Sequence, residues 1–306
     1  MSRRRSDPAA QLAAIEALVC RDIGRNTQKL IEANRGGLAS AAISLASATS
    51  VGLITGFAVP QGGKAAPETD GPVGAALLAA ALVACGVPSR IAVDSPCGAA
   101  VRTAAAAAGG GVPIDEVAVD DADSVATCVE VWRKVGVSHA LAIERCGRSA
   151  DGRPRNMRGI DVSPWTAPLD DLFLGGNWVR IAVGDGGNEI GMGKLPFGLI
   201  AESVPMGAEI ASVTGCNHLV VAGVSNWGAY GLMASLAVLR PDWAPVVRDY
   251  LTAALDRSVT QTMVNEAGAI DGVTGRHEAT VDGLAAEVHA KLIEDLRRIA
   301  CAQGAD

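Results

Sequence analysis

The sequence contains few aromatic residues. Three phenylalanines, two tyrosines and five tryptophans occur among 306 residues, although 49% of the chain is hydrophobic. Alanine and glycine make up much of the remainder of the small and apolar residues. This composition is typical of a compact globular protein with closely packed helices and argues against a disordered or fibrous chain.

The seven cysteines show no pairing pattern. Their number is odd, no C-x-x-C motif occurs, and most lie in apolar surroundings. Free cysteine in such surroundings behaves as a small hydrophobic residue, so the pattern argues against both a zinc site and a disulfide framework. It favours a reducing compartment. Because the N-terminus also lacks a signal-peptide pattern, we expect a cytoplasmic protein.

Clustered positive charge is also scarce. The net charge is −7, and the basic residues cluster only at Arg3-Arg4-Arg5, which we interpret as a solvated tail. A nucleic-acid-binding function therefore has no electrostatic support.

One uncharged stretch is long enough to resemble a membrane span. It covers residues 38–59, but it is rich in serine, threonine and glycine and changes character near residue 49. We interpret it as a buried helix over 38–48 followed by a buried strand over 51–57, and we expect no membrane partner.

Short apolar runs alternate with helical segments along the chain. Strands are predicted at 51–57, 90–93, 116–119, 138–143, 179–183 and 217–224. Such near-continuous apolar strands predict a three-layer α/β fold, with a mostly parallel sheet and helices on both faces. We expect one domain over 1–306, in which 1–35 is an N-terminal helical extension and 243–306 a C-terminal helical part. The first helix is predicted to run from Pro8 to about Arg25, and residues 59–72 are predicted to be a loop.

Polar residues follow most of these strands. They are Glu68 and Asp70, Asp94, Asp120 and Asp121, Glu144, Asp185, and Ser225 and Asn226. The carboxyl ends of parallel strands share one edge of the sheet, where α/β proteins place their active sites. For Asp94, Asp120 and Asp121 helix capping is the preferred interpretation. The other acids need a counter-charge, either a hard divalent cation such as Mg²⁺ or Mn²⁺ or nearby lysine and arginine.

The stretch Ile181–Gly193 carries the densest polar pattern. A strand ends in a glycine-rich turn that places Asp185, Asn188 and Glu189 within five positions. The alternative is an ordinary strand-to-helix turn in which Asp185 or Asn188 is a cap. The turn is not a G-x-G-x-x-G fingerprint, so no nucleotide cofactor is predicted. Ser225 lacks a nucleophile-elbow pattern, which argues against a serine hydrolase.

A long irregular segment, 145–168, follows Glu144. Loops of this length inside a compact domain usually have a function. Its arginines, which include Arg148, Arg155 and Arg158, could hold a carboxylate or a phosphate through paired hydrogen bonds.

Four motifs in order give the chain a resemblance to a known family. They are Glu68-Thr69-Asp70-Gly71-Pro72, the segment from Glu144-Arg145 through Asn156-Met157-Arg158-Gly159 to Thr166-Ala167-Pro168-Leu169-Asp170, Gly184-Asp185-Gly186-Gly187-Asn188-Glu189-Ile190-Gly191-Met192-Gly193, and Val221-Ala222-Gly223-Val224-Ser225-Asn226-Trp227-Gly228. Over roughly residues 35–300 the chain resembles the D-glutamate cyclase C-terminal domain family, formerly a domain of unknown function. In its best-known members this domain follows a hydratase-like domain, and the two-domain protein cyclises D-glutamate to 5-oxo-D-proline. We expect the present chain to be a stand-alone form without that partner domain.

The resemblance implies a carbon–oxygen lyase (hydro-lyase) assisted by Mn²⁺ or Mg²⁺. Cyclisation needs a base, an electrophilic aid on the γ-carboxylate and an acid for the departing oxygen. The candidate catalytic residues are Glu144, which we favour as the base, Asp185 and Glu189. The candidate metal ligands are Glu68, Asp70, Asp185, Asn188 and Glu189. The candidate substrate-binding residues are Arg148, Arg155, Asn156, Arg158, Thr166, Ser225 and Asn226.

Two other functions remain open from the sequence. A carboxylate edge with arginines suits a Mn²⁺- or Mg²⁺-dependent phosphohydrolase equally well. A non-catalytic module that binds a small ligand is the third option. The partner is accordingly an acidic amino acid or a phosphorylated metabolite, and the sequence is compatible with a homo-oligomer.

Overall fold

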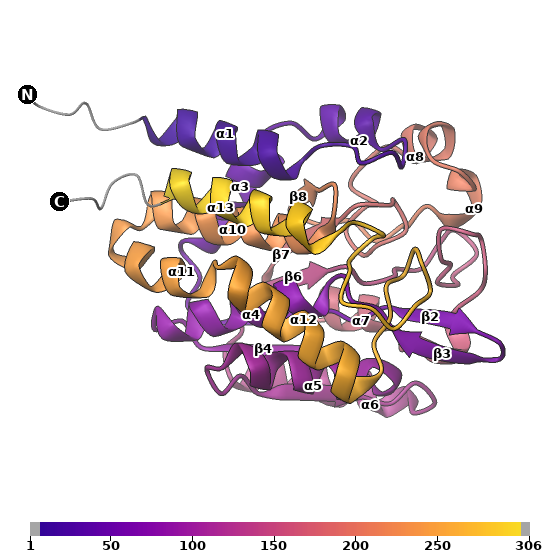
Figure 1. Cartoon of the computed structure of the whole chain (residues 1–306). Helices are drawn as coiled ribbons and strands as arrows, with labels where there is room; N and C mark the ends of the chain where they lie inside the picture. Colours follow the sequence, from indigo (N-terminus) through magenta and orange to yellow (C-terminus); the bar gives the residue numbers. More distant parts are fainter. Residues whose placement is uncertain (1–6, 301–306) are drawn as a thin grey trace, which may run out of the picture.

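The computed structural model describes residues 7–300 and is built around a six-stranded sheet (Figure 1). Its strands are β1 (Val51–Ile54), β4 (Ser89–Asp94), β5 (Ile114–Val117), β6 (His139–Ile143), β7 (Val179–Gly184) and β8 (His218–Val221). They lie in the order β5-β4-β1-β6-β7-β8, and every neighbouring pair is parallel. The predicted parallel α/β fold is confirmed. The arginines at positions 3–5 lie outside the described residues.

Alternate side chains along each strand enter two separate cores. On β6, Leu141 and Ile143 belong to one hydrophobic cluster, whereas Ala140 and Ala142 belong to the other. The first cluster is covered by α3 (Gly37–Leu45), α4 (Pro72–Ala84), α5 (Ser95–Ala108) and α10 (Ser225–Leu239). The second is covered by α6 (Ala122–Lys134), α7 (Leu169–Leu174), α8 (Phe197–Ser203) and α9 (Gly207–Ile210). Because successive side chains of a strand point to opposite faces, this division produces the predicted three layers.

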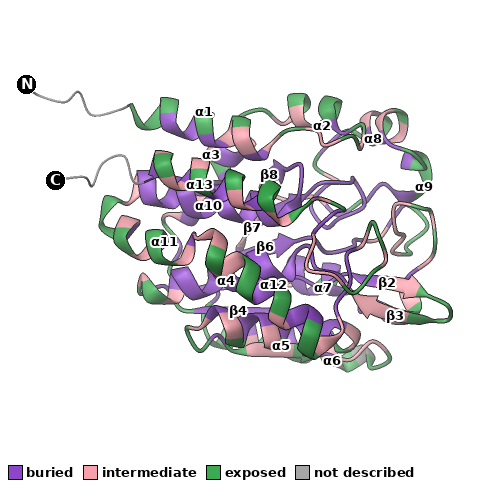
Figure 2. Cartoon of the chain, in the orientation of Figure 1, coloured by how far each residue is buried: buried purple, intermediate pink, exposed green. Residues whose placement is uncertain are grey.

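Further helices add to the first face of the sheet. They are α1 (Pro8–Val19), α11 (Ala244–Tyr250), α12 (Ala253–Ala267) and α13 (Ala286–Ala300), while α2 (Gln28–Ala33) contacts α8. Helix α1 lies against α10 and α13, and α12 lies against α5 (Figure 1). Helices α4 and α10 contain no charged residue and are buried on almost all sides (Figure 2), as expected of helices that are apolar all round. No helix in residues 7–300 combines the length and the apolar character that crossing a membrane requires.

The strand order has one reversal point. From β1 the chain moves outward to β4 and β5, and it then returns to the other side of β1 to form β6, β7 and β8. In open α/β sheets the crevice at such a point, outside the carboxyl ends of the two central strands, is where ligands bind. Here those strands are β1 and β6, and β6 is followed directly by Glu144.

Several predicted boundaries were wrong. The strands predicted at 116–119 and 217–224 lie at Ile114–Val117 and His218–Val221. The predicted loop at 59–72 contains an antiparallel hairpin of β2 (Ala58–Gln61) and β3 (Lys64–Pro67). Its turn, Gly62-Gly63, has positive φ at both positions (56° and 84°), which suits a tight hairpin and which glycine adopts without strain. Strand β1 ends at Ile54, before Gly56 at φ 103°. The first helix ends at Val19, so that Arg25 lies in a loop.

Candidate active site

A cavity of about 290 Å³ opens at the reversal point of the sheet. Three acids that follow strands line it, namely Glu68, Glu144 and Asp185. The rest of its wall comes from residues 24–26, Phe57 and Val59, the irregular loop at 156–158, Asn188, Pro205, and residues 272–273 of the C-terminal part. The cavity therefore joins segments from both ends of the chain to the carboxyl edge of the sheet.

Glu144 lies at the centre of this edge in a strained conformation. Its φ is 43°, a left-handed value that non-glycine residues adopt rarely and at a cost of about 1–3 kcal/mol. The Ser225 hydroxyl donates a hydrogen bond of 2.6 Å to Oε2 of Glu144. Burial, together with the negative charges of Asp185 and Glu189, raises the pKa of Glu144 well above its ordinary value.

Glu144 also explains a glycine in the first motif. A Cβ on Gly71 would lie 2.7 Å from the Cβ of Glu144, closer than real contacts allow. Gly71 moreover has a φ of 93°, which disfavours any other residue. The strained glutamate and the glycine opposite it are thus packed as a unit.

The turn after β7 is organised by Glu189. Its two carboxylate oxygens accept hydrogen bonds from the backbone N–H groups of Asp185, Gly186 and Gly187, at 2.8, 2.6 and 2.7 Å. Asn188 donates from Nδ2 to the carbonyl of Arg155 at 2.8 Å, which fastens the turn to the irregular loop. Within this turn Glu189 makes structural bonds, whereas Asp185 and Asn188 both line the cavity.

Asp185 forms an ion pair that the sequence did not predict. Arg25 Nη1 lies 2.6 Å from Oδ1 of Asp185, and Nη2 of the same guanidinium pairs with Oδ1 of Asp282. The second oxygens, Oδ2 of Asp185 and of Asp282, are buried and have no hydrogen-bond partner among the described residues. Burial raises the pKa of Asp185 well above its ordinary value, although Arg25 acts in the opposite direction.

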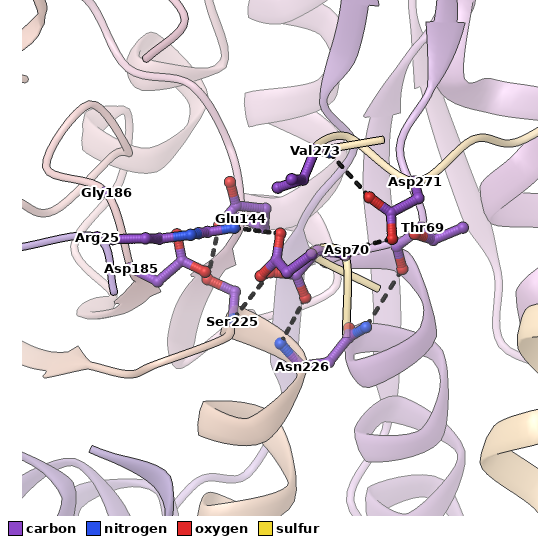
Figure 3. A network of polar contacts seen from close by, with 12 residues as sticks. Arg25, Thr69, Asp70, Glu144, Asp185, Gly186, Ser225, Asn226, Asp271 and Val273 are labelled. Atoms are coloured by element: carbon purple, nitrogen blue, oxygen red, sulfur yellow. Dashed lines mark hydrogen bonds and ion pairs between the residues drawn. The ribbon is translucent and has the colours of Figure 1, made fainter. Parts of the chain in front are cut away.

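Asp70 and Asn226 cap each other's helices (Figure 3). The carboxylate of Asp70 accepts the N–H groups of Ser225 (2.9 Å) and Asn226 (2.8 Å) at the start of α10. The amide oxygen of Asn226 in turn accepts the N–H groups of Gly71 (3.0 Å) and Gly74 (2.8 Å) at the start of α4. Two helix N-termini therefore meet at the site, and each is closed by a side chain from the other's entrance.

The pKa of Asp70 is raised to about 8. The causes are burial and then the charge of Asp282, which together outweigh the hydrogen bonds from Asn226 and Ser225. The pKa of Glu68 is also raised well above its ordinary value, by burial and by Asp282 and Asp70. Buried carboxylates that lie next to one another stay protonated unless a cation neutralises their charge.

The loop between α12 and α13 docks beside Glu68. Backbone hydrogen bonds join Ile270 N to the Pro67 carbonyl and Thr69 N to the Ile270 carbonyl, both at 2.9 Å. A Cβ on Gly272 would lie 1.8 Å from Oε1 of Glu68, so a larger residue there would displace the Glu68 carboxylate. The loop thus closes the cavity from the C-terminal side.

The arginines of the irregular loop have different surroundings. Arg148 pairs with Asp170 and Asp171, and Arg155 pairs with Asp151. Among the described residues, the Arg158 guanidinium is in no ion pair, and it lines the cavity together with Asn156. Thr166 and Arg148 instead line a separate pocket of about 190 Å³. The structure therefore brings Arg158 and Asn156 to the acids but not Arg148 or Thr166, and the roles predicted for all of them stay predictions.

Sequence reasoning missed Arg25, Asp271 and Asp282. The two aspartates are each followed by glycine, at 271–272 and 282–283, in the break between two helices, and this repeated Asp-Gly pattern was an available signal. No local signal connects Arg25 with residues 160 positions away, because the contact depends on the packing of α1 against α10.

Two groups of acids have the spacing of a cation site. Asp70, Asp185 and Asp282 form one group, and Glu144, Asp185 and Glu189 form the other, with one oxygen from each member within 4.8 Å of the others. Oxygen ligands of this kind suit Mg²⁺, Mn²⁺ or Ca²⁺. The buried Oδ2 atoms of Asp185 and Asp282, which have no hydrogen-bond partner among the described residues, are suitable ligands for such an ion.

Comparison with known proteins supports one family. The family described as "D-glutamate cyclase-like, C-terminal" matches residues 15–297. The Homo sapiens protein "D-glutamate cyclase, mitochondrial" is 32% identical to the chain over 299 residues, which is 87% of this chain and 48% of that protein. The chain thus spans about half the length of this curated relative.

Proposed function

The chain belongs to the D-glutamate cyclase-like C-terminal family, and from this premise we propose that it is a lyase that converts D-glutamate to 5-oxo-D-proline. The observation that carries the proposal is the acid-lined cavity at the reversal point of the sheet, with Glu144 at its centre. A volume of about 290 Å³ lies near the lower end of the range for small-ligand sites, roughly 300 Å³, and suits an amino acid.

The reaction moves two protons from nitrogen to oxygen. The α-amine nitrogen bonds to the γ-carboxyl carbon, and one γ-oxygen leaves as water. The ammonium group gives up two protons on becoming the ring N–H, and the departing oxygen takes up two. One group that accepts protons and then returns them can therefore serve both ends of the reaction.

Glu144 suits that role of proton carrier. It lines the cavity, and its raised pKa means that it binds and releases protons at higher pH than an exposed glutamate. Ser225 fixes one oxygen, Oε2, and thereby the orientation of the carboxyl group. We assign Glu144 the transfer of protons from the ammonium nitrogen to the departing oxygen.

A divalent cation complements the acids at this edge. Asp185 and Asp70 would hold it, since Asp185 has an orphaned buried oxygen and both belong to one of the acid groups described above. When bound, the ion would supply Lewis-acid polarisation of the γ-carboxylate. Mn²⁺ and Mg²⁺ are the proposed ions.

Arg158 and Asn156 supply the complementary charge and polarity for the substrate. Arg158 is the cavity residue whose guanidinium has no carboxylate partner among the described residues, so it can pair with the α-carboxylate. Asn156 uses its Oδ1 to accept the N–H groups of Arg158 and Ile160, which shapes the loop that carries the arginine.

The test is an assay of purified protein with D-glutamate, L-glutamate and a generic phosphomonoester, each with and without Mn²⁺. We expect 5-oxo-D-proline from D-glutamate, with turnover that depends on the added ion. Hydrolysis of the phosphomonoester alone would replace the proposal with a phosphohydrolase. Tight binding of D-glutamate without any turnover would instead identify a ligand-binding module.

A further inference from the structure

We propose that Asp282, presented by the loop between α12 and α13, is the third protein ligand of a divalent-cation site formed with Asp70 and Asp185. The catalytic role of the ion rests on the proposed function, whereas the position of the ion site follows from the contacts of the three aspartates. The site joins three distant parts of the chain, namely the entrance of α4, the end of β7 and the C-terminal loop.

The three aspartates are buried, and two of them carry an oxygen without a hydrogen-bond partner among the described residues. Asp70, Asp185 and Asp282 are at most 7% exposed, and each offers one carboxylate oxygen within 4.8 Å of the others. Two of the three residues, Asp185 and Asp282, carry a buried Oδ2 without a hydrogen-bond partner among the described residues. An unpaired buried carboxylate oxygen is costly, and a hard cation with oxygen ligands removes that cost.

Arg25 takes the other oxygen of the same two aspartates. Its Nη1 bonds to Oδ1 of Asp185 and its Nη2 to Oδ1 of Asp282, so the guanidinium holds the two side chains side by side (Figure 3 shows Arg25 against Asp185). One guanidinium carries a single charge against three carboxylates. Arg25 therefore orients the ligands and leaves negative charge for a second cation.

The C-terminal loop is built to present Asp282. Asp271 accepts four hydrogen bonds, from the N–H groups of Val273 (2.9 Å), Thr274 (3.0 Å) and Gly283 (2.8 Å) and from the hydroxyl of Thr280 (2.7 Å). These bonds fold the loop on both sides of Asp282, which has a φ of 58°. Aspartate is among the few residues other than glycine that adopt this left-handed conformation readily, and an Asp-Gly pair suits such a turn.

The second acid group is less suited to an ion. Glu189 uses its carboxylate for the three N–H groups of its own turn, and Oε2 of Glu144 accepts from Ser225. In the group with Asp282, Asp70 likewise uses both of its oxygens for N–H groups. Among the described residues, that group nevertheless has two orphaned oxygens, on Asp185 and Asp282, whereas the second group has only that of Asp185. Asp185 belongs to both groups and also lines the cavity, so an ion at the proposed site would lie beside the substrate.

The experiment is a titration of the full-length protein with Mn²⁺, without substrate, followed by electron paramagnetic resonance of the free ion. We expect Asp282→Asn to weaken binding by at least about ten-fold, because changes even in groups that only orient ligands have effects of that size. Glu287→Gln removes one negative charge from an exposed position on α13 and should leave the affinity unchanged.

Thermal unfolding distinguishes a ligand from a structural partner of Arg25. As a ligand, Asp282 adds repulsion to the ion-free protein, so Asp282→Asn should keep its melting temperature without metal and lose the increase that Mn²⁺ gives the parent protein. A lower melting temperature without metal, together with unchanged Mn²⁺ affinity, would overturn the inference. Absence of Mn²⁺ binding to the parent protein would overturn it as well.

These outcomes are separable from those of the cyclase assay. Ion binding that depends on Asp282 in a protein that does not cyclise D-glutamate would support this site and refute the proposed reaction. If the parent protein cyclises D-glutamate but Asp282→Asn leaves its Mn²⁺ affinity unchanged, the proposed reaction is supported and this site is refuted.

Discussion

At the scale of single residues, Glu144 combines three features that rarely occur together. It is buried, its backbone is left-handed, and its pKa is raised by that burial and then by neighbouring carboxylates. Strained, buried titratable groups of this kind concentrate at functional sites because the surrounding structure must hold them in place.

Glu144→Gln should therefore lower kcat strongly while the protein stays folded. The glutamine keeps the size and the hydrogen bond from Ser225 but cannot carry protons, so we expect a loss of about 10²–10⁴-fold in kcat. Steady-state formation of 5-oxo-D-proline measures this, and a melting curve checks the fold. Activity within a few-fold of the parent would remove Glu144 from the proton-transfer role.

Arg158 should act on binding of substrate rather than on its conversion. Arg158→Ala removes a charge-assisted hydrogen bond of about 1.5–3 kcal/mol, which corresponds to an increase in KM of about ten-fold or more with little change in kcat. Arg153→Ala is the matched control, because Arg153 lies in the same loop, is 61% exposed and pairs with Asp161. Equal effects of the two substitutions would show that only the charge of the loop matters.

At the scale of elements, the entrances of α4 and α10 support each other. Asp70 closes α10 and Asn226 closes α4, although 156 positions separate the two residues. The caps also hold Gly71 against Glu144 and Ser225 beside its carboxylate. The geometry of the proposed base therefore depends on two helix starts.

Asn226→Ala should cost both stability and activity. It leaves the Gly74 N–H at the start of α4 without its acceptor and the Gly71 N–H with Asp70 Oδ1 alone, and loss of a single cap costs about 1–2 kcal/mol. Urea denaturation measures the stability, and the cyclase assay is run where both proteins are folded. Thr252→Ala is the control, since Thr252 caps α12 by accepting from Leu255 N, away from the cavity.

The two variants should lose similar stability but differ in activity. We expect Thr252→Ala to retain kcat and Asn226→Ala to lose it. If both retain full activity, the reciprocal caps are purely structural.

At the scale of the whole molecule, the fold buries more negative than positive charge at one edge of the sheet. Burial raises the pKa values of Glu68, Asp70, Glu144 and Asp185, and that of Asp70 reaches about 8 from an ordinary 3.8. The folded protein consequently binds protons more tightly than the unfolded chain between these two values. The associated stability is present at low pH and is lost as the pH rises toward about 8.

The metal-free protein should therefore become less stable as the pH rises. From about pH 5 to about pH 8 we expect the free energy of unfolding to fall by about 2 kcal/mol or more. Added Mg²⁺ should reduce the slope, because the ion replaces the protons on the carboxylates. Denaturant melts at several pH values with EDTA or with Mg²⁺ measure both effects. A pH-independent stability in EDTA would show that these acids are not protonated in the folded state.

Much of the fold could be predicted from local pattern. Apolar runs such as 138–143 and 179–183 gave strands β6 and β7 to within a residue, and their uninterrupted apolar character predicted a parallel sheet buried on both faces. The hairpin β2–β3 was not predicted because its strands are short and half exposed, and because Pro60 and Pro67 argue against strands.

The sequence by itself determined that Glu144 and Asp185 lie at one edge, because polar residues after parallel strands gather there. Glu68 and Asp70 reach that edge from the antiparallel hairpin β2–β3, which the sequence did not predict. Only the tertiary structure decided which partners the acids of this edge have. Glu189 accepts N–H groups of its own turn, Asp70 accepts N–H groups at the start of α10, and Asp185 pairs with Arg25. Only the tertiary structure, too, brought Asp282 to them from the C-terminal loop. Strand periodicity is a local property that a sequence displays directly. The pairing of a buried charge depends on which distant segments pack together, and that is settled by the fold as a whole.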